Sequence, residues 1–68
     1  MPKSVTPKQV IKALITKGFV LKRIKGSHHL FQHPETKRRA LVPLHTGDIP
    51  KGTLNDILKH SGLSHEDL

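Results

Sequence analysis

The sequence contains no cysteine, tryptophan or tyrosine, and its only aromatic residues are Phe19 and Phe31. Without cysteine, neither a disulfide framework nor a Cys/His zinc site can stabilise a domain of 68 residues. So few rings also argue against a protein that stacks successive single-stranded bases on exposed aromatic side chains, and at least one phenylalanine is expected in the core. A modest hydrophobic core, with or without a partner chain, must therefore provide the stability.

Long apolar stretches are also missing. The apolar run over residues 10–15 is short and is interrupted by Lys12, so it fits neither a secretory signal nor a membrane span. We therefore expect residues 1–68 to form one soluble, cytoplasmic domain that does not associate with a membrane.

Acidic residues are absent from the first half of the chain. Residues 1–34 contain seven lysines and arginines and no acid, whereas residues 35–68 contain five basic and five acidic residues, so the whole net charge of +7 lies in the first half. A surface of one sign attracts polyanions through counterion release, and nucleic acid is the commonest polyanion in cells. The alternative is a solvated basic face that binds no ligand.

A first helix is predicted from residue 7 onward. Thr6 provides an N-cap hydroxyl, Pro7 occupies the first helical position, and Gln9 completes a capping box. Gly18 provides the left-handed residue that ends the helix. The spacing of the apolar positions predicts one buried stripe, formed by Val10, Ile11, Leu14 and Ile15.

An extended pattern follows, with predicted strands over residues 19–25, 28–33 and 38–44 and a turn over residues 33–37. Gly26-Ser27 fits a two-residue hairpin loop with glycine first, which places Lys25 opposite His28 and Arg23 opposite Leu30. Neither strand alternates cleanly, and a slip by one residue would reverse the faces. Pro43 indicates that the third strand ends there or lies at an edge.

A second helix is predicted to begin around Pro50 and to end at Gly62, followed by the capped first turn of a short helix over residues 64–67. Its apolar side carries Leu54, Ile57 and Leu58. The predicted fold is thus α+β in the order α-β-β-β-α, with a three-stranded antiparallel sheet and two helices on one face.

His28 is the best candidate for chemistry. It lies directly after the hairpin loop, beside Lys25 and diagonally near Arg23 on the preceding strand, which also carries Lys22. A phosphate can be held among these positive charges. Imidazole titrates near pH ~6.5 in model peptides, so a histidine can act as base or acid at cellular pH. Such a group can move protons to and from a bound phosphate ester, and neighbouring cations can stabilise the negative charge that develops on it.

Two short polar segments have two readings each. Ser27 either donates its hydroxyl or backbone N–H to a phosphate oxygen, or is an ordinary turn residue. Gly52-Thr53, near the start of the second helix, either binds phosphate through free backbone N–H groups or marks a helix entry that needs close packing.

The other histidines are given different roles. His29 is predicted to point to the face opposite His28 and to act as a packing or rim residue. His33 and His45 are predicted to be hydrogen-bonding residues of a loop or strand end. No carboxylate–histidine or Cys/His spacing supports a metal site, so neither a metal nor a cofactor is expected.

Five blocks of the sequence occur in an order that is typical of one family. They are Lys17-Gly18-Phe19, Gly26-Ser27-His28-His29, Val42-Pro43-Leu44-His45, Ile49-Pro50-Lys51-Gly52-Thr53-Leu54, and Ile57-Leu58-Lys59 with Gly62-Leu63-Ser64. Together they make the chain resemble the HicA toxins, partners of HicB in bacterial and archaeal toxin–antitoxin systems, over nearly its whole length.

The resemblance implies a fold similar to double-stranded-RNA-binding domains and a ribonuclease that cleaves messenger RNA and arrests translation. It implies that His28 is the single catalytic histidine. The candidate RNA-binding residues follow from their positions near His28 instead, and they are Lys22, Arg23, Lys25 and Ser27. A HicB-like antitoxin would cover the His28 face, and the toxin would form oligomers only through that complex. The alternative is a non-catalytic RNA-binding module of the same fold.

Overall fold

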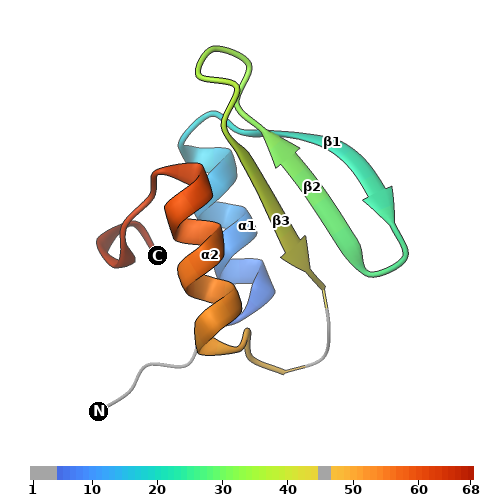
Figure 1. Cartoon of the computed structure of the whole chain (residues 1–68), viewed down its shortest axis with the longest axis vertical. Coiled ribbons are helices and arrows are strands. Elements are labelled where there is room, and N and C mark those ends of the chain that lie inside the picture. Colours follow the sequence, from blue (N-terminus) through green and yellow to red (C-terminus); the bar gives the residue numbers. More distant parts are fainter. Residues whose placement is uncertain (1–4, 45–46) are drawn as a thin grey trace.

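The computed structural model describes residues 5–44 and 47–68. No helix within those ranges is long and apolar enough to cross a membrane. The elements are, in chain order, helix α1 (Pro7–Thr16), strands β1 (Val20–Lys25), β2 (His28–Gln32) and β3 (Arg39–Pro43), helix α2 (Lys51–Ser61), and a short 3-10 helix η1 (His65–Asp67) (Figure 1). The predicted order α-β-β-β-α is therefore confirmed.

Both predicted ends of α1 are present. The backbone N–H of Thr6 donates to the Gln9 side chain at 2.9 Å, and the N–H of Gln9 donates to the Thr6 hydroxyl at 3.3 Å. At the other end, Gly18 has φ +96°, and the N–H of Phe19 donates to the Leu14 carbonyl at 2.9 Å, which closes the helix in a Schellman motif.

The predicted apolar stripe of α1 is wrong at one position. Val10 and Leu14 are fully buried and Ile11 packs against the core, but Ile15 is 58% exposed. The buried face of the helix is centred between Val10 and Leu14 and includes Ala13 instead. Successive residues are about 100° apart on a helix, so Ile15 is turned away from the face that Val10 and Leu14 share.

The three strands form an antiparallel sheet in the order β1-β2-β3. Gly26, the first loop residue of the β1–β2 hairpin, has φ +59°, as the predicted turn requires. Lys25 pairs with His28 and Arg23 with Leu30, so the predicted register is confirmed. Beyond Arg23 the register shifts by one residue at a β-bulge, where Lys22 is the extra residue.

One face of the sheet packs against the helices. Phe31, Ala40 and Val42 are buried, and the strand pairing places all three on the same face. Both helices contact the sheet through β3, so two helices cover one face of the sheet, as predicted (Figure 1). Every residue of β1, by contrast, is exposed. The core is one cluster that also joins the two helices and their flanking segments, with Val5, Val10, Leu14, Phe19, Ile49, Leu54, Ile57 and Leu58.

All three strands are slightly shorter than predicted, and β1 begins at Val20, one residue after its predicted start. β2 ends at Gln32 because His33 turns the chain: its Nδ1 accepts the backbone N–H groups of Glu35 and Thr36 at 3.1 and 3.2 Å. The His33 ring also packs edge-on against Phe19, with the centroids 5.3 Å apart. Pro43 ends β3, which is an edge strand, as its proline indicated.

The C-terminal part follows its predicted boundaries. α2 ends at Gly62, which is left-handed with φ +79°. Ser64 then starts η1, and its backbone N–H donates to the Asp67 carboxylate at 2.9 Å. The same carboxylate lies 3.2 Å from the Lys17 ammonium, so the last turn is attached to the end of α1.

Candidate functional site

His28 is the first residue of β2 and is exposed. Its cross-strand partners are Lys25 on β1 and Pro43 on β3. Since Phe31, three residues along the strand, faces the helices, His28 lies on the open face of the sheet. The backbone therefore presents this imidazole on the solvent side of the sheet, directly after the hairpin turn.

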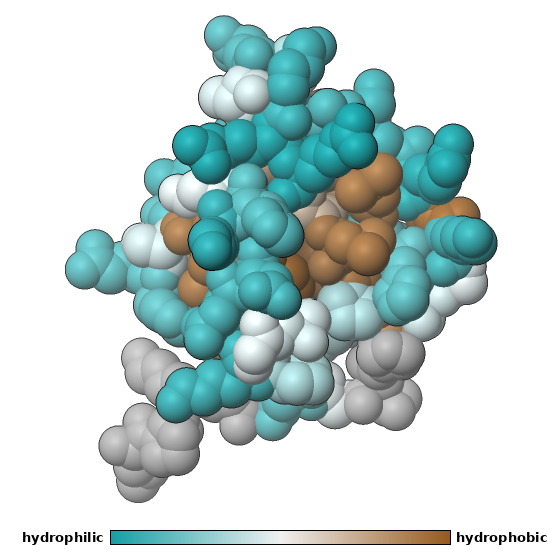
Figure 2. Space-filling view, viewed as in Figure 1, coloured by the Kyte–Doolittle hydropathy of each residue, from teal (hydrophilic) through white to brown (hydrophobic). Residues whose placement is uncertain are grey.

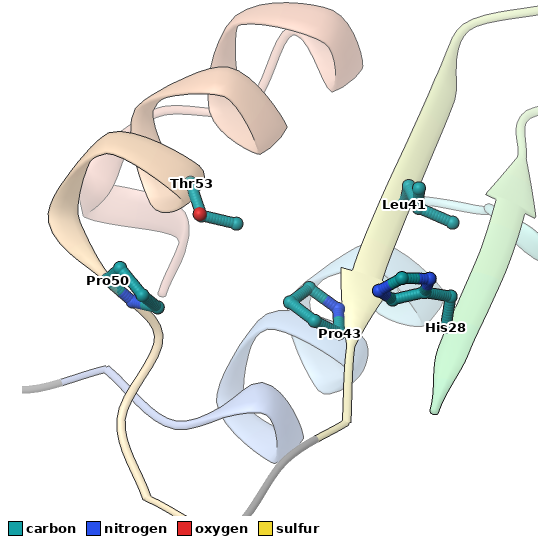
Figure 3. Close-up of a pocket in the computed structure, with 5 residues that line it drawn as sticks. All are labelled: His28, Leu41, Pro43, Pro50 and Thr53. Atoms are coloured by element: carbon teal, nitrogen blue, oxygen red, sulfur yellow. The ribbon is translucent and has the colours of Figure 1, made fainter. Parts of the chain in front are cut away.

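A hollow of about 300 Å³ lies next to this imidazole. Its walls come from three elements that are distant in the sequence: His28 from β2, Leu41 and Pro43 from β3, and Pro50 and Thr53 from the start of α2. Figure 3 shows the His28 ring pointing across β3 toward Pro43, with Pro50 and Thr53 on the opposite side. Of these five side chains, only His28 is of a type that can serve as a general acid or base.

The start of α2 gives this hollow a positive end. The first intrahelical bond is donated by the Leu54 N–H to the Pro50 carbonyl at 2.9 Å, so the N–H groups of residues 51–53 precede the helical ladder. Within the described residues no side chain caps this end, and its first turn carries no acid. Exposed N–H groups and the helix dipole favour an anion at such an end.

Gly52 fits a free helix end better than a packed one. A Cβ placed on Gly52 would meet no described atom within 4 Å, and its φ is not in the left-handed range. Close packing inside the described parts of the chain therefore does not explain this glycine, which contradicts one of its two readings. Glycine costs a helix interior roughly 1 kcal/mol relative to alanine.

The predicted basic residues lie around His28 in different ways. Lys25 is directly opposite His28, and Arg23 lies two residues further along β1 on the same open face. Lys22, as the bulged residue, has no partner position on β2. Ser27 is half-buried, and its carbonyl accepts the Leu44 N–H at 2.6 Å, so its backbone joins the hairpin turn to the end of β3.

The remaining histidines separate from His28. His29 pairs with buried Val42 and so lies on the face opposite His28, as predicted. Its Nδ1 is buried and has no hydrogen-bond partner in the described part of the chain. His33 is the predicted hydrogen-bonding turn residue, and the prediction for His45 lies outside the described residues.

No group of three or more His, Cys, Asp or Glu side chains that could hold a metal ion occurs in residues 5–44 and 47–68. The expectation that the protein uses no metal remains a prediction.

Sequence reasoning missed the apolar walls of the hollow. Leu41, Pro43 and Pro50 read as ordinary strand and cap residues, and only their meeting in space makes them neighbours of His28. The sequence offered no signal for this, because Leu41 looks like an ordinary core residue in the middle of a strand, and only the structure shows it to be 50% exposed. Figure 2 shows hydrophobic surface over the sheet, surrounded by hydrophilic side chains.

Fold and site together define a small, basic α+β protein that presents one imidazole on an open sheet face. The family model of the HicA toxin of bacterial toxin–antitoxin systems matches residues 7–63. The chain therefore belongs to the HicA toxin family, whose members are generally ribonucleases and which implies a cognate antitoxin. No curated relative matches the chain.

Proposed function

We propose that this toxin is a metal-independent endoribonuclease that cleaves messenger RNA and that His28 is its catalytic residue. The observation that supports this most is the position of His28, on the rim of a hollow whose far side is the N-terminal end of α2. A phosphate in that hollow would lie between the imidazole of His28 on one side and the N-terminal end of α2 on the other.

The chemistry is that of an internal phosphoryl transfer. The neutral imidazole of His28 takes the proton of the 2′-hydroxyl, and the 2′-oxygen attacks the adjacent phosphorus. The bond to the 5′-oxygen of the next nucleotide breaks, which leaves a 2′,3′-cyclic phosphate, and the departing 5′-oxygen takes a proton from solvent water on the open face of the sheet. Well-placed acids and bases accelerate such proton transfers by about 10²–10⁴-fold.

Cations and the helix end are assigned to the developing negative charge. Lys25 is the nearest strand partner of His28, and Arg23 extends the same face. They flank His28 on the β1 side, while the α2 N-terminus lies across the hollow on the β3 side. Lys22 and Ser27 are assigned to the neighbouring RNA backbone, Ser27 through its hydroxyl.

The same surface is proposed to bind the antitoxin. A HicB-like protein with an acidic surface covers His28 and β1, so RNA cannot enter, and the opposite charges speed the capture of the toxin. Hydrogen exchange of the purified complex tests this. Residues 22–30 should exchange more slowly than in free toxin, and a complex that still cleaves RNA at the full rate contradicts occlusion.

A direct experiment tests the nuclease. Purified toxin is incubated with messenger RNA in EDTA, and the product ends are analysed. Cleavage with 2′,3′-cyclic phosphate ends is the expected result. Binding without cleavage, with or without added metal, would instead support the non-catalytic RNA-binding module. The hollow is consistent with that alternative because His28 is the only one of its five lining side chains of a type that can act as an acid or base.

A further inference from the structure

Strand β1 presents an unused sheet edge. It is the first strand in the order β1-β2-β3, and no described segment pairs with its outer side. Three of its six residues are apolar and still largely exposed: Val20 at 50%, Leu21 at 43% and Ile24 at 56%. An exposed edge with apolar side chains is a template for another strand. The bulge at Lys22 and the three cations of β1 protect this edge against nonspecific pairing, so only a strand of complementary charge fits it.

The hydrogen-bond pattern shows which groups this edge offers. The Leu44 N–H donates to Ser27 and the His33 N–H donates to Arg38, so the odd-numbered residues of β2 bond to β3. The even-numbered residues, His28 and Leu30 among them, therefore bond to β1. Their partners on β1 are Lys25 and Arg23, whereas Ile24 is opposite His29.

Ile24 consequently directs its backbone N–H and C=O away from β2, toward the free edge. Residue 24 lies between the bulge at Lys22 and the hairpin turn, in the part of β1 where the register with β2 is regular. This short stretch is able to continue the sheet by one more strand.

The charges of β1 decide what kind of strand fits. Lys22, Arg23 and Lys25 give the strand three positive charges and no negative charge. A second copy of this chain paired through β1 would bring two such strands together, and like charges on paired strands repel. RNA would satisfy the cations but would leave Val20 and Ile24 without apolar contacts. An extended protein segment with acidic and apolar residues meets both requirements.

We propose that the cognate antitoxin inserts an acidic, extended segment beside β1 as a fourth strand of the toxin sheet. The inference rests on the proposed function, because it assumes an antitoxin that covers the His28 face. Strands are spaced about 4.8 Å apart, so the added strand runs roughly 10 Å from β2. The added strand continues the open face that carries Lys25 and His28, so the antitoxin chain that follows the strand is placed to cover this face, which connects strand addition to inhibition.

The decisive measurement is amide hydrogen exchange, resolved by residue with NMR, on free toxin and on toxin saturated with its cognate antitoxin. The Ile24 amide should exchange at least ~10-fold more slowly in the complex, because strand addition gives it a carbonyl partner. An Ile24 amide that exchanges equally fast in both states would overturn the proposal even if the antitoxin inhibits cleavage.

A matched pair of variants provides the second test. Proline is tolerated at an edge position whose N–H faces solvent, so Ile24→Pro should keep the fold while it removes the backbone N–H donor. Ile24→Ala also removes the isoleucine side chain, but it keeps the backbone N–H. Ile24→Pro should bind the antitoxin at least ~10-fold more weakly than Ile24→Ala. Equal affinities would refute strand addition. If Ile24→Pro does not fold, chemically synthesised toxin with N-methyl-isoleucine at position 24 replaces it.

Two further results separate this proposal from its neighbours. Protection of the Ile24 amide by a short RNA alone would reassign the edge to nucleic acid. Cleavage of RNA by the free toxin is measured in parallel: a protein that never cleaves refutes the proposed function. A protein that cleaves, is inhibited and gains protection at His28 and its neighbours but not at Ile24 refutes only strand addition.

Discussion

Replacing His28 by alanine should abolish RNA cleavage while preserving the fold. If His28 transfers a proton in the reaction, its loss should slow cleavage by about 10²–10⁴-fold, which corresponds to roughly 3–5 kcal/mol of transition-state stabilisation. The structural cost should be small because the side chain is exposed and lies outside the core. A cross-strand contact contributes about 0.2–1 kcal/mol, so unfolding free energy should fall by less than about 1 kcal/mol.

His29→Ala is the matched control. It removes the same imidazole one residue away, from the opposite face, where His29 is half-buried beside Val42. It should keep cleavage within a few-fold of the wild type and change the unfolding free energy by about 1 kcal/mol. Initial cleavage rates in EDTA and urea unfolding followed by circular dichroism measure the two quantities. Equal loss of activity in both variants, or an unfolded His28→Ala protein, refutes the assignment.

Three further predictions concern charge and backbone. RNA binding should weaken steeply with salt, and Lys25→Ala should reduce the slope of log K against log salt by about 0.9 for a duplex; salt-independent binding would exclude the basic face as the RNA site. Gly18→Ala should destabilise the protein by at least about 1 kcal/mol in thermal unfolding, because φ is +96° and a Cβ would lie 3.1 Å from the His33 Nε2. The Ser64 backbone N–H, and then the Lys17 ammonium, hold the pKa of Asp67 below its ordinary value of 3.8. The ionised carboxylate therefore stabilises the fold at pH values above 3.8, and this stabilisation is lost as the pH falls through the lowered pKa. The free energies of unfolding of wild type and Asp67→Asn should therefore differ at pH 6 and converge at acidic pH.

The features that sequence predicted well are local. The capping box of Thr6 and Gln9 and the left-handed glycines at positions 18 and 62 act within one turn of the chain, and all are present. The hairpin register was also predictable, because a two-residue loop with Gly26 first leaves Lys25 and His28 only one way to pair. Features that depend on only four or five consecutive residues can be predicted from those residues alone.

The features that sequence did not predict depend on contacts between distant segments. The bulge at Lys22 was not predicted. Apolar and polar residues do not alternate cleanly in β1 or in its neighbour β2, so neither strand alone indicates where an extra residue falls. The hollow was missed because Leu41 and Pro50 become neighbours of His28 only when α2 docks against β3. The exposure of Ile15 likewise follows from which side of α1 meets the sheet.

The exposed β1 strand also connects stability with control of the toxin. None of its six residues is buried, so β1 adds no side chain to the core cluster, although it carries Arg23 and Lys25 beside His28. A partner that covers β1 would supply the burial that the chain itself lacks there. Binding to the folded state adds about 2.7 kcal/mol of apparent stability at a free ligand concentration of 100 Kd. Under the proposed function, release from the antitoxin therefore both opens the RNA site and returns the toxin to the smaller stability of its own core.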